Sequence, residues 1–182
     1  LPSIFSSGVT QINILVGTII ASFQSGAVSY LYYADRVYQI NLAIAGIAVG
    51  TVSLPVLTKA LKSKNLSKVS DIQNKSIQLS LLLSVPATLG LIIASEEIVN
   101  GLFGYGSFTL KDIKMTSDAL MFFGYGVIAF ALIKILSNFF FARDNTKTPF
   151  YISTFIVFVN VVISITFFNQ IGFLIIPIAT SI

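Results

Sequence analysis

The sequence contains neither cysteine nor histidine, and charged residues make up only 10% of its 182 positions. Without cysteine there is no disulfide framework, thiolate nucleophile or cysteine-based metal site, and without histidine the commonest general base is missing. Nothing in the chain resembles a hydrolytic triad, a metal-binding cluster or a carboxylate pair, so we expect neither an enzyme nor a bound cofactor. Soluble domains usually carry about 25% charged residues. Together with 55% hydrophobic residues, the scarcity of charge is typical of a membrane protein.

Long uncharged stretches predict an all-α, polytopic transmembrane helical bundle. A spanning helix needs about 20 apolar residues, which predicts about five full spans and a truncated sixth. The spans are expected at residues 4–24, 28–58, 72–95, 113–142, 149–168 and 171–182. The chain begins without methionine and ends inside an apolar run that is too short to cross a bilayer. We therefore expect a single membrane domain, 1–182, that is an internal piece of a longer protein.

Local signals refine the limits of these spans. Glycines and aromatic residues at 101–106 predict a turn at the membrane interface. Thr109 and Asp112 have the spacing of a capping box, which predicts the start of the next helix. Thr148 is expected to cap a further helix that begins at Pro149.

Basic residues gather in two of the predicted connections. After the second span come Lys59, Lys62, Lys64, Lys68 and Lys75, and after the fourth come Arg143 and Lys147. The opposite connections hold only Arg36, Lys111 and Lys114. By the positive-inside rule, both basic connections face the cytoplasm and the first span runs from cytoplasm to exterior. We interpret the net charge of +4 as a topology signal and expect no nucleic-acid partner.

Asp35 and Arg36 are the only charges in the first 58 residues. In one interpretation they anchor the second span at the outer interface, beside a belt of tyrosines. In the other they face a water-filled cavity, where the planar guanidinium of Arg36 suits the oxygens of a phosphate. Lys134 is the only charge in the apolar body of the fourth span. It either snorkels to the cytoplasmic side or lines the same cavity as a second cation.

Small and polar residues at membrane depth favour helix packing. Gly46 and Gly50 lie four residues apart on one helix face, where small residues let another helix approach closely. Amide side chains such as that of Asn160 are expected to make interhelical hydrogen bonds.

Two stretches of sequence carry a family resemblance. They are Ser29-Tyr-Leu-Tyr-Tyr-Ala-Asp-Arg-Val-Tyr-Gln39 and Phe141-Ala-Arg-Asp-Asn-Thr-Lys-Thr-Pro149. With softer matches at 46–55, 102–109 and 179–182, they make the chain resemble the MurJ/MviN proteins. These are lipid II flippases of the multidrug/oligosaccharidyl-lipid/polysaccharide exporter superfamily. The resemblance implies helices seven to eleven, and the start of twelve, of a two-lobed transporter.

The resemblance also implies a substrate and a location. The family moves lipid II, an undecaprenyl-diphosphate-linked disaccharide-pentapeptide, across the bacterial inner (cytoplasmic) membrane by alternating access for peptidoglycan synthesis. Arg36 matches an arginine of the cationic cavity that takes the diphosphate, and Asp35 matches its neighbour in the motif. The implied partners are lipid II, the lipid bilayer and the N-terminal lobe of the same protein, which this sequence does not include.

Coupling to sodium or to the membrane potential is a further implication for some members of the family. Asn160 and Thr180 match plausible sodium-ligand positions. Acidic ligands are expected near Gly17 and Ser164, and neither position is acidic. Because a hard cation prefers charged oxygen ligands, the sequence argues against a sodium site.

Two other functions remain open at this stage. An ion-coupled drug or small-molecule antiporter of the same superfamily would need a titratable acid inside its helices, and Asp35 is the only one at depth. A non-transporting membrane scaffold would gain nothing from Arg36 or Lys134 within its spans.

Overall fold

The computed structural model describes the backbone of residues 2–182 and the side chains of residues 11–182. Every regular element in this part of the chain is helical, as the uncharged stretches predict. The elements are α1 (Pro2–Ala21), α2 (Ala27–Leu42), the π-helical η1 (Ala43–Ala48), α3 (Val49–Lys62), α4 (Leu66–Ile93), α5 (Ser95–Phe103), α6 (Leu110–Phe141), α7 (Lys147–Ile171), the 3-10 helix η2 (Gly172–Leu174) and α8 (Ile175–Ser181). Four helical runs within these residues are long and apolar enough to cross a membrane, namely Ala27–Lys62, Leu66–Ile93, Leu110–Phe141 and Lys147–Ser181.

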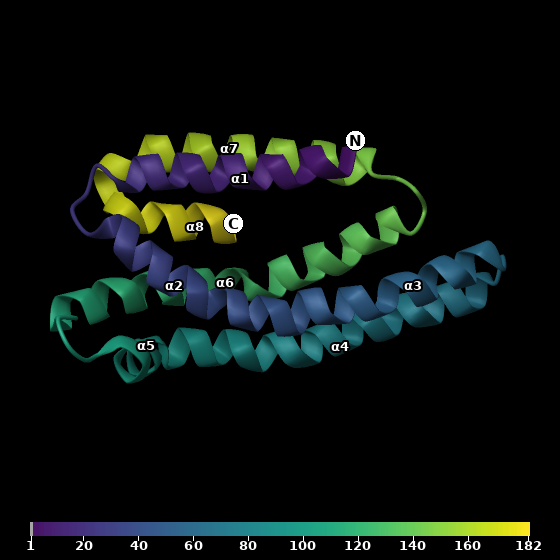
Figure 1. Ribbon diagram of the computed structural model, residues 1–182, viewed down its shortest axis with the longest axis horizontal. Helices are drawn as coiled ribbons and strands as arrows, with labels where there is room; N and C mark the ends of the chain where they lie inside the picture. Colours follow the sequence, from purple (N-terminus) through teal and green to yellow (C-terminus); the bar gives the residue numbers. More distant parts are fainter. Residues whose placement is uncertain (1) are drawn as a thin grey trace.

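The helices form two layers, which Figure 1 shows one above the other. In one layer α1 lies alongside α7, and the short α8 lies between this pair and the second layer. In the second layer α2 and α3 run antiparallel to α4, and α6 packs against both α2 and α4. The α3–α4 turn and the α6–α7 connection, which carry the basic residues, lie at one end of the bundle. The α1–α2 linker and the loop after α5 lie at the other end.

The second predicted span is longer than expected and passes through η1 without a break. Helical structure continues from Ala27 to Lys62, so Lys59 and Lys62 belong to the last turn of α3 rather than to a loop. The α3–α4 turn is therefore short, and α4 begins at Leu66 instead of residue 72. Asn65 caps α4 by accepting a hydrogen bond of 2.9 Å from the Lys68 N–H. At about 1.5 Å per residue, the 36-residue run exceeds the roughly 30 Å of bilayer hydrocarbon, so its basic end extends beyond the apolar region.

Residues after α4 are more helical than the sequence indicates. Helix α5 occupies Ser95–Phe103 and has Glu96 and Glu97 in its first turn. Negative side chains in the first turn stabilise a helix, because they interact favourably with the positive end of the helix dipole. The predicted turn is therefore confined to the residues after Phe103. The capping box of Thr109 and Asp112 is confirmed, and α6 starts at Leu110.

The predicted start of α7 is wrong by two residues. The helix begins at Lys147, with Thr146 at the N-cap, rather than at Pro149 with Thr148 as the cap. The capping contact comes from Asn145, whose side-chain oxygen accepts a hydrogen bond of 3.2 Å from the Thr148 N–H. The side-chain amide of Asn145, two residues before the helix begins at Lys147, thus supplies the hydrogen-bond acceptor that the start of the helix needs.

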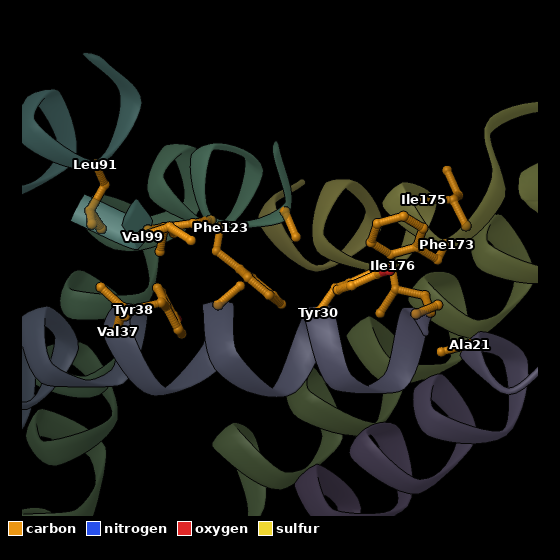
Figure 2. Packing of buried hydrophobic residues seen from close by; sticks show 14 of the residues in the cluster. Ala21, Tyr30, Val37, Tyr38, Leu91, Val99, Phe123, Phe173, Ile175 and Ile176 are labelled. Atoms are coloured by element: carbon orange, nitrogen blue, oxygen red, sulfur yellow. The ribbon is translucent and has the colours of Figure 1, made fainter. Parts of the chain in front are cut away.

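Two apolar clusters form the core, one between the layers and one within the second layer. The larger joins α2 and α6 to the α1 and α8 side; Figure 2 shows Tyr30, Tyr38, Phe123 and Phe173 at its centre. The smaller lies between α3, α4 and α6 and includes buried residues such as Leu57, Ile135 and Phe139. The buried face of α4 is instead small and polar, with a hydroxyl every fourth residue from Ser76 to Thr88. Small side chains of this kind let neighbouring helices approach closely.

Gly46 and Gly50 face α6 where it packs closely against the α2–α3 helix. A β-carbon at Gly46 would lie 3.1 Å from the Cα of Ala131, and one at Gly50 would overlap the amide nitrogen of Asn138. The contact at Gly46 is with backbone, which has no rotamer through which to move away. In contrast, a β-carbon at Gly90, within α4, would meet nothing within 4 Å.

We predict that Gly46→Leu destabilises the protein by about 1–3 kcal/mol, because it overpacks a helix–helix contact. Thermal unfolding of the full-length protein in detergent measures the effect, and Gly90→Leu is the matched control. The lower midpoint temperature should be confined to Gly46→Leu. Equal midpoints for the two variants would contradict the close helix packing at Gly46.

Candidate anion-binding cavity

A cavity of about 600 Å³ lies between the two layers of helices. Its walls come from α1, α2, α7 and α8, with one residue from α6. The polar residues that line it are Gln11, Asn13, Thr18, Tyr32, Asp35, Arg36, Gln39, Asn160 and Thr180. Four of the five predicted binding residues are thus brought to one cavity, although 144 positions separate Arg36 from Thr180 in the sequence. Among the described residues that line it, Arg36 is the sole cation and Asp35 the sole carboxylate.

The amphipathic character of α2 directs Arg36 to this cavity. One face of the helix buries Tyr30, Ala34, Val37 and Tyr38, and Tyr38 stacks on Phe123 of α6 with ring centroids 5.3 Å apart. Figure 2 shows Tyr30, Val37 and Tyr38 on the side of α2 that meets this core. The opposite face carries polar residues three or four positions apart, a spacing that places them side by side on a helix. These residues therefore face the cavity.

The N-terminal part of α2 is held in place by contacts of Tyr30 and Tyr33. The Tyr30 hydroxyl donates a 2.9 Å hydrogen bond to the Asp112 carboxylate, whose other oxygen accepts bonds from the backbone and hydroxyl of Thr109. Tyr33 packs against Phe103 and Phe108, at centroid distances of 4.8 and 5.5 Å. These contacts tie α2 to α5 and to the cap of α6. Sequence reasoning missed them, since no local pattern pairs these residues.

Arg36 and Asp35 are adjacent in sequence but engage different neighbours. The Arg36 guanidinium lies over the ring of Tyr32, 4.7 Å from its centroid, a stabilising cation–π arrangement. The Asp35 carboxylate accepts a hydrogen bond from the Gln39 amide. Among the described side chains, no carboxylate lies within 4.0 Å of the guanidinium nitrogens. The donors of Arg36 therefore remain available to an anion in the cavity, for which their planar fork is suited.

Asn160 and Thr180 form the far wall of the cavity. The Asn160 amide donates a 3.2 Å hydrogen bond to the Thr180 hydroxyl, which itself donates to the Ile176 carbonyl at 2.7 Å. The Ser164 hydroxyl, one turn from Asn160, is buried and has no hydrogen-bond partner among the described residues. The contact joins α7 to α8, as expected of an amide at membrane depth.

This wall does not fit a sodium ion. Its oxygen donors are neutral, and Gly17, the position where the resemblance implies an acid, lies against Ile176, whose side chain would be 3.5 Å from an added β-carbon. Within residues 11–182 there is no cluster of three or more histidine, cysteine or acidic side chains that could hold a metal. Carboxylates are common ligands of hard cations, and this wall has none among the described residues; Asn160 and Thr180 form a hydrogen-bonded contact between α7 and α8.

Lys134 does not line the cavity. It is exposed on α6 and lies beside Gly46, whose added β-carbon would be 3.5 Å from the β-carbon of Lys134. Arg36 and Lys134 are thus on separate parts of the surface, and the expected second cation is absent from the described lining. Helix spacing alone could not predict this outcome, because it depends on how α6 is rotated against α2.

Solved transporters share this arrangement of helices. A transporter of the MOP superfamily from Pyrococcus furiosus, whose binding pocket is described as having reversed polarity, matches 99% of the chain with a TM-score of 0.82 at 17% identity. An outward-facing multidrug-resistance transporter of the same superfamily gives a TM-score of 0.83 at 16% identity. At these identities the likeness shows the fold alone, a helical arrangement that the chain shares with both of these membrane transporters.

The particular family follows from the sequence comparisons. The sequence model of the family described as "Lipid II flippase MurJ" matches residues 1–182. A probable lipid II flippase MurJ of Rhizobium meliloti is 44% identical over 94% of the chain, and one of Rickettsia prowazekii is 40% identical over the whole of this chain. A solved lipid II flippase MurJ in an inward closed conformation has a TM-score of 0.90 at 30% identity, covering 99% of the chain and 38% of that structure. The chain belongs to the MurJ family, and the predicted resemblance is confirmed.

The chain spans about a third of the length of these curated relatives, 32% of the Rhizobium protein and 36% of the Rickettsia protein. It is a multi-pass membrane segment with the fold of a transporter.

We predict that sodium does not stabilise the full-length protein through the α7–α8 wall. The thermal midpoint should be the same in NaCl and in an equal concentration of choline chloride, because the donors at Asn160 and Thr180 are uncharged. A sodium-specific rise in the midpoint that Thr180→Val abolishes would show that the wall binds the ion after all.

Proposed function

We propose that the chain is the part of a lipid II flippase of the bacterial inner membrane that contributes Arg36 to the binding of the substrate diphosphate. The observation that carries the proposal is the position of Arg36, and its lack of a carboxylate partner among the described residues, in a chain of the MurJ family. Its guanidinium lines a cavity between helices, rests on an aromatic ring and has no carboxylate partner among the described residues. The remaining part of the protein completes the cavity.

The chemistry of the proposed step is binding and release without covalent change. A diphosphate carries negative charge that the apolar region of a bilayer excludes. A guanidinium in a polar cavity can replace part of its hydration with charge-assisted hydrogen bonds. The neutral amides and hydroxyls around Arg36 offer further hydrogen bonds to a sugar or peptide head group. Alternating access then requires the cavity to open in turn to each side of the membrane.

The proposed role of Asp35 is to hold the Gln39 side chain in place on the polar face of α2. Its carboxylate is held by Gln39 one turn along the helix, so that it stays in the cavity wall without pairing with Arg36. Lys134 has no part in binding the diphosphate in this proposal, because it does not line the cavity.

An ion-coupled antiporter of the same superfamily is the principal alternative, since its fold is shared. That function requires a titratable acid or a cation site, and the described lining offers Asp35 alone. A membrane scaffold would not need a cation at this depth, where charge is costly and usually functional. Under either alternative the protein does not transport lipid II, so replacing Arg36 by a neutral polar residue has no effect on lipid II transport.

We predict that Arg36→Ala in the full-length protein abolishes growth when the cell's own lipid II flippase is depleted. Loss of a charge-assisted contact of about 1.5–3 kcal/mol lowers substrate affinity by roughly ten- to a hundredfold. Arg36→Lys should restore part of the activity, because it keeps the charge and loses the planar fork.

Lys111→Ala is the matched control, since it removes a cation from the same half of the bundle but outside the cavity. Its growth should equal that of the unmodified protein, and all variants should be present in the membrane at equal levels on immunoblots. Normal growth of the Arg36→Ala strain would refute the assignment of Arg36 to the substrate.

A further inference from the structure

A second concave surface lies on the other side of the bundle, between η1–α3 and α4. This groove has a volume of about 500 Å³. One wall presents Ile44, Ala48, Val52 and Val56, at intervals of four residues. The other wall, on α4, includes Ile72, Leu79 and Leu83. None of its lining residues is shared with the cavity around Arg36.

The groove offers almost no hydrogen bonding to an occupant. Its two hydroxyls are used within their own helices: Ser53 donates to the Gly50 carbonyl at 3.1 Å and Ser76 to the Ile72 carbonyl at 2.8 Å. Lys75 is the only charged residue in the described lining. A fitting occupant is therefore an apolar chain that carries a negative charge at one end.

Lys75 lies near the end of the groove that faces the basic turn, about one helical turn inside Ile72. Its ammonium contacts Asp71 at 2.9 Å, but both side chains are more than half exposed, at 72% and 58%. An exposed ion pair of this kind is weak, so a phosphate can compete for the lysine. Further along the α3–α4 turn are Lys59, Lys62, Lys64 and Lys68, with no other acid between 59 and 75.

The length of the groove indicates which apolar chain fits. From Ile44 to Val56 the helical rise is about 18 Å, close to half of the roughly 30 Å hydrocarbon thickness. The groove thus covers the depth of one leaflet, from the basic end of the bundle toward the bilayer centre. That depth matches an acyl chain of a phospholipid, whose phosphate would then lie at the level of Lys75.

We propose that this groove is a binding site for an anionic phospholipid of the leaflet that faces the basic turn. One acyl chain lies between α3 and α4, and the phosphate contacts Lys75 in place of Asp71. The site is separate from the lipid II cavity and does not depend on the role proposed for Arg36.

The test is the retention of lipid by the full-length protein, measured by native mass spectrometry after titration with phosphatidylglycerol or phosphatidylcholine of identical acyl chains. Lys75→Gln should lower the retention of phosphatidylglycerol about fivefold, the effect of one lysine near an anionic surface, and leave phosphatidylcholine unchanged. Lys111→Gln, at the opposite end of the bundle, is the matched control and should change neither.

A second pair of variants tests the apolar part. Val52→Trp fills the groove from an exposed position and should lower the retention of both lipids, whereas Val85→Trp, exposed on α4 outside the groove, should not.

The proposal is overturned if Val52→Trp has no effect, or if Lys75→Gln and Lys111→Gln behave alike. It is also overturned if undecaprenyl phosphate displaces phosphatidylglycerol from an Arg36→Ala protein, because the groove then takes the substrate's tail. It is overturned as well if the unmodified protein shows no preference for phosphatidylglycerol over phosphatidylcholine.

Discussion

The central feature of this structure is one guanidinium that lines a polar cavity and has no carboxylate partner among the described residues. A charge at membrane depth is costly unless water or a partner compensates it. The structure places Arg36 in a cavity with amide and hydroxyl groups on several sides and rests it on the ring of Tyr32. Asp35, the nearest carboxylate in sequence, is occupied by Gln39. The same environment that makes the charge tolerable leaves its donors available to an anion.

The long α2–α3 helix connects that site to the remainder of the fold. Its buried face forms the largest apolar cluster with α6, and its polar face forms the wall of the cavity. The close contact of Gly46 with the α6 backbone limits how far the two helices can shift. Toward its basic end the same helix forms the apolar groove with α4. The polar cavity around Arg36 and the apolar groove are thus built on successive parts of one helix.

Charge distribution alone predicted the fold class, because only an uncharged helix of sufficient length is compatible with the bilayer interior. It failed at the helix ends: apolarity marks the hydrocarbon region, whereas Lys59 and Lys62 continue the helix beyond it. Helix α5 was missed because it is short and carries two acids in its first turn. For the site, the motif around Arg36 predicted a cavity residue, but the exclusion of Lys134 required the packing of α6 on α2. Such non-local geometry leaves no periodic signal in the sequence.

The most direct measurement of the central claim is the affinity of the full-length protein for lipid II in lipid nanodiscs, with and without Arg36→Gln. This substitution keeps a polar, hydrogen-bonding side chain of similar length and removes only the charge and the planar fork. The account predicts that the dissociation constant rises about tenfold or more, as expected for the loss of a charge-assisted bond, while the thermal midpoint is unchanged. An unchanged dissociation constant would contradict it, since the diphosphate would then be bound without Arg36.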